Sequence, residues 1–158
     1  MPIYMAFLKI DGIEGEVAEQ DHKGSIELLS FQWGVGRGAA SGTQSSGSGG
    51  GAGKVNFQDF HFTKKPDRAS SQIFLKLDDT ERKAGGYVLI EHGGLDQAGG
   101  ASESPFYKVM FEGIMFTQFM QGGHPLTPNE EFPTEQVSFN FHKAQIMFPS
   151  SQPSTGVS

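Results

Sequence analysis

Asp59 and His61 are the two residues whose types and spacing most suggest catalysis or metal binding. Residues two apart on a strand project from the same face, so this carboxylate and imidazole could form an acid–base pair or supply two metal ligands. A metal site needs at least one further ligand, and the remaining histidines are scattered along the chain. The sequence therefore favours surface or packing roles for both residues.

Two glycine-containing motifs resemble nucleotide-binding loops but lack the elements that such loops require. Residues 34–39 match the dinucleotide pattern G-x-G-x-x-[GA]. Pyrophosphate binding also requires a helix directly after the glycines, and the residues that follow are almost wholly Gly, Ser and Ala. Gly53-Lys54 does not complete a phosphate loop, because Ser48 stands in place of the first glycine and Val55 in place of the Mg²⁺-binding Ser or Thr. We therefore predict no cofactor.

Two pairs of adjacent carboxylates are the remaining residues that could take part in catalysis. These pairs are Asp78-Asp79 and Glu130-Glu131. Glycosidase chemistry depends on the distance between two carboxylates in space, which adjacency in sequence does not give. Solvated turns explain both pairs better. The sequence offers no Ser–His–Asp or Cys–His arrangement. The absence of cysteine excludes disulfides and thiolate metal sites. We predict that the protein is not an enzyme.

The composition predicts one folded, β-rich domain. The chain has 158 residues, 36% of them hydrophobic, and includes 14 Phe. Its net charge of −6 disfavours nucleic acid and anionic membranes, which select basic surfaces. The sequence lacks both an apolar run of about 18 residues and a basic start followed by an apolar segment. We therefore expect no membrane insertion and synthesis in the cytoplasm without a signal peptide.

Alternation of apolar and polar residues predicts about seven strands and one helix. The expected strands cover residues 5–11, 25–35, 55–64, 87–91, 106–120, 137–141 and a last segment around 146–148. A helix is expected over residues 67–79, with Asp67 or Ser70 as its N-cap. Residues 93–104 and 122–133 are expected to be loops. One helix among many strands predicts a β-barrel or a sandwich.

Residues 106–120 predict one long strand, or two with a kink at Gly113, that is apolar on both faces, with Val109 and Phe111 on one face and Ile114 and Phe116 on the other. Strands that are apolar on both faces need cover on both sides. A helix of about three turns cannot cover the outside of a whole barrel. We therefore favour neighbouring subunits as the remaining cover over the alternative that a few aromatic side chains simply lie exposed.

Residues 34–53 form an expected loop of mostly Gly, Ser and Ala, in which Arg37 is the only charged residue. A long loop without secondary structure in a compact domain is usually functional or disordered. Small residues also permit close approach of another subunit's backbone, so we favour a contact surface over a passive spacer. The candidate contact residues are Gly36, Arg37, Gly38, Ser41, Gly42, Gly49, Gly51 and Lys54.

Several segments in order resemble the Hcp family (haemolysin-coregulated proteins), the tube-forming subunits of the bacterial type VI secretion system. The strongest match is residues 53–64 (GKVNFQDFHFTK), followed by residues 67–70 (DRAS). The other matching segments are residues 6–16, 22–34, 106–109 and 133–141. Several blocks at plausible spacing are more specific than a lone motif.

This resemblance implies a mainly β fold, a small β-barrel of two sheets with one flanking α-helix, over residues 1–148. It implies homo-hexameric rings that stack into a tube inside a contractile sheath, with a VgrG spike at the tip. By this resemblance the tube is assembled in the cytoplasm and then secreted, and its lumen can hold small effectors. The loop at 34–53 would contact neighbouring rings. Residues 149–158 are expected to be a disordered tail, too short for an effector domain.

Two other readings stay open at the level of sequence. The chain could be the tail tube protein of another contractile injection system, which would use the same physical principles of assembly. It could also be a monomeric ligand-binding β-barrel, which would require an apolar pocket between the sheets and no exposed apolar face.

Overall fold

The computed structural model describes residues 4–19, 22–37, 55–82, 84–92 and 105–148. Most of the predicted loop at 34–53, the loop at 93–104 and the tail at 149–158 lie outside these ranges. The elements in chain order are β1 (Tyr4–Ile10), β2 (Ile26–Glu27), β3 (Ser30–Arg37), β4 (Val55–Lys64), α1 (Arg68–Lys76), β5 (Ala84–His92), β6 (Pro105–Gly122), β7 (Thr134–Asn140) and β8 (Lys143–Met147).

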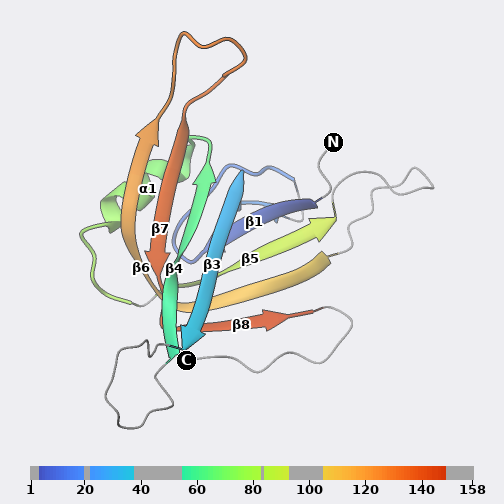
Figure 1. Cartoon of the computed structure of the whole chain (residues 1–158), viewed down its shortest axis with the longest axis vertical. Coiled ribbons are helices and arrows are strands. Elements are labelled where there is room, and N and C mark those ends of the chain that lie inside the picture. The colour runs from blue at the N-terminus through green and yellow to red at the C-terminus, as the bar shows by residue number, and fades with distance from the viewer. Residues whose placement is uncertain (1–3, 20–21, 38–54, 83, 93–104, 149–158) are drawn as a thin grey trace, which may run out of the picture.

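Two antiparallel sheets share the long strand β6, and α1 flanks them (Figure 1). The first half of β6 pairs with β5 and β8, and β5 continues through β1 to β2. The second half pairs with β7, which continues through β4 to β3. This arrangement confirms the predicted fold class, a mainly β, barrel-like structure of two sheets with one helix. No helix in the described part of the chain is long and apolar enough to cross a membrane.

Gly113 lets one strand serve both sheets. Its φ of 73° is in the left-handed region that favours glycine, and a Cβ there would overlap the ring of His142. The bend also changes which residues face the core: Val109 and Phe111 are buried before it, and Ile114 and Phe116 after it. The predicted assignment of these residues to two opposite faces is therefore wrong, because all four face one core.

The structure corrects two further boundaries. The expected strand at 25–35 is split between the sheets, since β2 pairs with β1 whereas β3 pairs with β4. The interruption falls at Leu28-Leu29, and a register shift within β3 lies between Gln32 and Gly34. β3 also continues to Arg37, so the first four residues of the predicted loop, 34–37, belong to a strand.

The core is an aromatic cluster between the sheets. Phe60, Phe111, Phe139 and Phe141 are almost fully buried, and the Phe60 and Phe139 rings stack with centroids 4.9 Å apart. Burial of each Phe contributes about 1.5–3 kcal/mol, so this cluster is a main source of stability. The rings fill the space between the sheets and hold them together.

His22 fastens the segment before β2 to the end of β5. Its Nδ1 lies 2.5 Å from a Glu19 oxygen, its Nε2 lies 2.9 Å from a Glu91 oxygen, and its ring stacks on Phe7. Both ring nitrogens can donate hydrogen bonds only when the imidazole is protonated. Burial by itself would lower the pKa of His22, but the hydrogen bonds and charges of the two carboxylates outweigh burial and raise it.

The raised pKa predicts that His22 stabilises the fold at acidic to neutral pH. This contribution is complete below the unfolded pKa of about 6.5 and disappears as the pH rises through the higher folded value. The melting temperature of a His22→Gln variant should therefore fall below that of the unmodified chain at about pH 6, and the two should converge as the pH rises above neutral. A His22→Gln deficit that stays constant with pH would contradict the prediction.

Candidate assembly site

The structure describes only two of the predicted contact residues. Gly36 and Arg37 are exposed at the end of β3, opposite Asn56 and Val55 of β4. A Cβ at Gly36 would meet nothing within 4 Å, so this end of the strand is open to a neighbour. Gly38, Ser41, Gly42, Gly49, Gly51 and Lys54 lie outside the described residues.

Asp59 and His61 do share one face of β4, as predicted, but each is hydrogen-bonded to its neighbours in the sheet. Thr117 Oγ1 donates to Asp59 at 2.7 Å and Asn140 Nδ2 at 3.1 Å. His61 Nδ1 lies 2.6 Å from Ser138 Oγ. The described residues contain no group of three His, Cys, Asp or Glu placed to hold a metal ion. This geometry suits a hydrogen-bonded surface.

The sheet β3-β4-β7-β6 has one apolar and one polar face. Phe60, Phe62 and Phe139 fill the apolar face, which lies against the other sheet. The opposite face carries hydroxyl, amide and imidazole groups that bond across strands, as between Ser30 and Thr63 and between Ser138 and Gln118. This second face is mainly hydrophilic, with the exposed Met120 beside Gln118.

The two edge strands of the same sheet are free of strand partners within the described part of the chain. One edge is β3, which pairs only with β4, and the other is the second half of β6, which pairs only with β7. They lie on opposite sides of the sheet and run in opposite directions (Figure 1). Residues 30–36 and 114–121 contain neither a charge nor a proline, the features that usually protect exposed edges from pairing.

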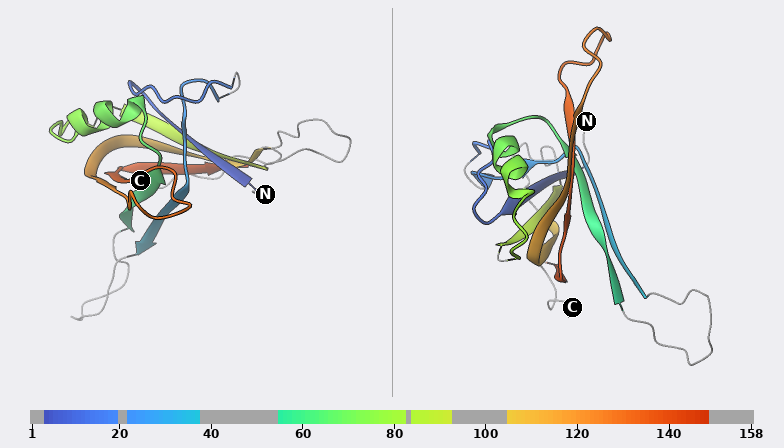
Figure 2. Two further views of the ribbon diagram at one scale, coloured as in Figure 1. Left: turned by 90° about the horizontal axis from the view of Figure 1, so that it is seen from above. Right: turned by 90° about the vertical axis from the view of Figure 1, so that its left-hand side faces the viewer.

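Ends of two strand pairs extend past the rest of the molecule in opposite directions. The β6–β7 hairpin extends at one end, and the ends of β3 and β4 at the other (Figure 2).

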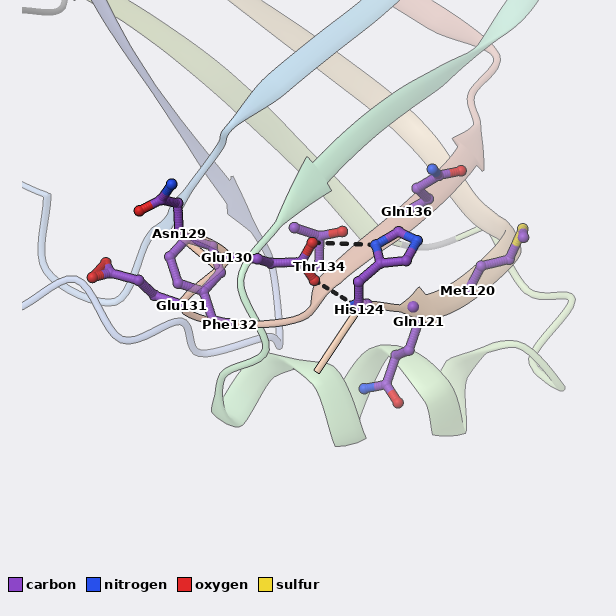
Figure 3. Close-up of a pocket in the computed structure, with 11 residues that line it drawn as sticks. Met120, Gln121, His124, Asn129, Glu130, Glu131, Phe132, Thr134 and Gln136 are labelled. Carbon is purple, nitrogen blue, oxygen red and sulfur yellow. Dashed lines mark hydrogen bonds and ion pairs between the residues drawn. The ribbon is translucent and has the colours of Figure 1, made fainter. Parts of the chain in front are cut away.

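The loop of the β6–β7 hairpin and the adjoining strand ends line an open hollow of about 790 Å³ (Figure 3). Glu130 accepts from the His124 backbone N–H and lies beside its ring; the backbone bond is the main reason that the pKa of Glu130 is lowered. Leu126 on the same loop is almost completely exposed.

A buried ionic network holds α1 against this sheet. Lys64 and Glu135 are cross-strand partners with no exposed surface, and Lys64 Nζ lies 2.8 Å from a Glu135 oxygen. Lys64 also donates to Asp67 at 2.7 Å and Ser70 at 3.0 Å, the two residues of the capping box that begins α1. Gln121 of β6 donates to the other Glu135 oxygen at 2.6 Å. Three strands and the start of the helix therefore meet at one ion pair.

Sequence reasoning identified the strand containing Lys64 and both capping residues but missed the network and the two edges. Lys64 continues the inward-facing series of Phe60 and Phe62 in this alternating strand. That pattern could have indicated a buried lysine, which requires a buried carboxylate partner. The edges depend on strand order, which alternation of residues does not specify.

Comparison with known proteins finds one matching family model and solved structures of Hcp proteins that share this fold. The family model described as "Type VI secretion system effector, Hcp" matches residues 7–148. Hcp1 of Salmonella typhimurium has a TM-score of 0.69 at 22% identity, covering 92% of this chain and 88% of that one. A type VI secretion effector of Yersinia pestis has a TM-score of 0.65 at 25% identity, with coverages of 96% and 95%. The secreted protein Hcp3 of Pseudomonas aeruginosa has a TM-score of 0.66 at 16% identity, covering 98% and 97%. None of the curated proteins matches the chain.

The buried pair predicts a large loss of stability when one partner is removed alone. Glu135→Leu leaves the buried Lys64 with only one of its two carboxylate partners, Asp67, and should lower the free energy of unfolding by about 3 kcal/mol, measured by urea titration. The double variant Lys64→Met/Glu135→Leu should lose less than the sum of the two single changes, because no buried charge remains unpaired. Lys9 and Glu14 form a partly exposed pair, and Glu14→Gln should cost less than about 1 kcal/mol. Additive losses in the double variant would argue against strong coupling.

Proposed function

The chain belongs to the Hcp family, the tube proteins of type VI secretion systems, and on that premise we propose that it assembles as hexameric rings that stack. The observation that carries this proposal is the pair of unprotected edges on one sheet. β3 and the second half of β6 run in opposite directions, so β6 of one copy and β3 of the next can continue the antiparallel sheet. A contact between two different surfaces of the same chain produces a ring when the rotation closes.

In such a ring the polar face of the sheet lines the lumen. The second sheet and α1 add bulk to the other face, so they lie outside when the sheet curves into a closed wall (Figure 2). The lumen would present Gln118, His61, Ser138 and their neighbours, with Asp59 as a carboxylate in that row. Hydroxyl and amide groups suit transient hydrogen bonding to secreted effectors without strong ionic trapping. We propose no catalytic role for this wall.

The wider assembly follows from the family. We propose that the rings form in the cytoplasm, stack inside a contractile sheath beneath a VgrG spike, and leave the cell with it. The monomeric ligand-binding barrel is disfavoured because Phe60, Phe111 and Phe139 occupy the space between the sheets where its pocket would be required.

Charge on the β3 edge should prevent ring formation. Val35 is exposed on the core-facing side of this strand, opposite Phe57, and a lysine there introduces the protection that natural edges use. Size-exclusion chromatography with light scattering should give six times 17.1 kDa for the unmodified chain and for Val35→Thr, and 17.1 kDa for Val35→Lys. A monomeric unmodified chain at about 100 µM, well above the dissociation constants of stable interfaces, would refute the ring.

The loop after β3 should act in stacking instead of in ring closure. We propose that the stretch from Gly36 to Lys54, including Arg37, Gly38, Ser41, Gly42, Gly49 and Gly51, contacts the adjacent ring, since β3 and β4 extend toward that end of the molecule (Figure 2). Deletion of residues 42–51 should leave single rings in solution but remove stacked rings from negative-stain micrographs. Residues 42–51 are Gly or Ser except at Thr43 and Gln44, so Thr43→Gly/Gln44→Ser keeps the length and separates it from sequence. Stacks that persist after the deletion would contradict this assignment.

A further inference from the structure

Helix α1 exposes two large apolar side chains that point in different directions. Phe74 is 61% exposed and Leu75 is 74% exposed. Ser70 and Phe74, one turn apart, both face β6 and β7: Ser70 donates to Glu135, and the Phe74 ring lies 5.9 Å from that of Phe119. Leu75 is about 100° further around the helix, at 3.6 residues per turn, and projects away from β6.

Phe74 therefore lies beside the second half of β6, whose outer edge has no strand partner in the described part of the chain. Phe119 belongs to this half and is only partly buried, although it packs against the core. Together Phe74 and Phe119 form an apolar patch at this edge, on the face of the sheet that bears the core.

The other edge has matching aromatic residues on the same face. Phe31 and Trp33 of β3 are partly buried; Phe31 stacks on Phe60, and Trp33 makes an edge contact with Phe111. Val35 further along the strand is exposed. The aromatic core thus reaches both edges of the sheet and is incompletely covered at each.

We propose that Phe74 of each chain packs on the core-facing side of β3 in the neighbouring copy, so that α1 completes the next subunit's core. This inference rests on the proposed ring and names the surface that closes it. The occupant is a second copy because the uncharged segment 30–36 supplies apolar side chains on the required face, and β3 is antiparallel to β6. An external partner that approached α1 from outside would instead contact Leu75.

Matched substitutions on α1 test this placement. Phe74→Ser should raise the protein concentration at which half of the rings dissociate by about tenfold or more, since burial of a Phe is worth more than the 1.4 kcal/mol that a factor of ten represents. Leu75→Ser removes a more exposed apolar group and should leave this concentration unchanged. Phe74→Leu should restore most of the ring stability. Circular dichroism should show the same fold for all three variants.

Trp33 provides a second readout, because it is the single tryptophan of the chain. Its emission should shift to shorter wavelength as rings form, and this shift should require higher concentrations in Phe74→Ser. Equal dissociation of Phe74→Ser and the unmodified chain would overturn the inference while leaving the ring intact. An effect of Leu75→Ser alone would also overturn it and would assign the exposed helix face to another contact. An unmodified chain that never forms rings would instead refute the proposed function.

Discussion

The buried pair of Lys64 and Glu135 is the constraint on which the arrangement of the molecule depends. Neither charge is accessible to water, so each must find its partners within the protein. Those partners come from the adjacent strand, from the first turn of α1 and from β6. Because such hydrogen bonds depend on direction, the network specifies where the helix begins and how it lies against the sheet, which apolar packing alone specifies less narrowly.

The position of α1 connects this network with assembly. The same side of the helix that presents Ser70 to Glu135 presents Phe74 to Phe119 one turn later. A change in the network would therefore displace the apolar patch at the β6 edge. In the proposed ring, the stability of one subunit and its contact with the next are linked through a single turn of helix.

The sequence predicted local structure better than long-range arrangement. β4 and the start of α1 were predicted closely, because alternation around Phe60 and Phe62 and the cap at Asp67 are local signals. The assignment of Val109, Phe111, Ile114 and Phe116 to opposite faces was wrong, since a left-handed glycine reverses the alternation and a residue's φ is not evident from periodicity. The predicted site lies mainly in a segment outside the described residues, whereas the unprotected edges depend on strand order, which local sequence does not encode.

The continuity of β6 through Gly113 has a mechanical consequence. In the proposed tube each subunit would be loaded along the tube axis during expulsion, and a subunit whose sheets were joined only by packed side chains could shear between them. Here the backbone of one strand belongs to both sheets, so covalent bonds carry load from the β6–β7 hairpin into the first sheet. The subunit should accordingly respond to axial force as a single stiff body.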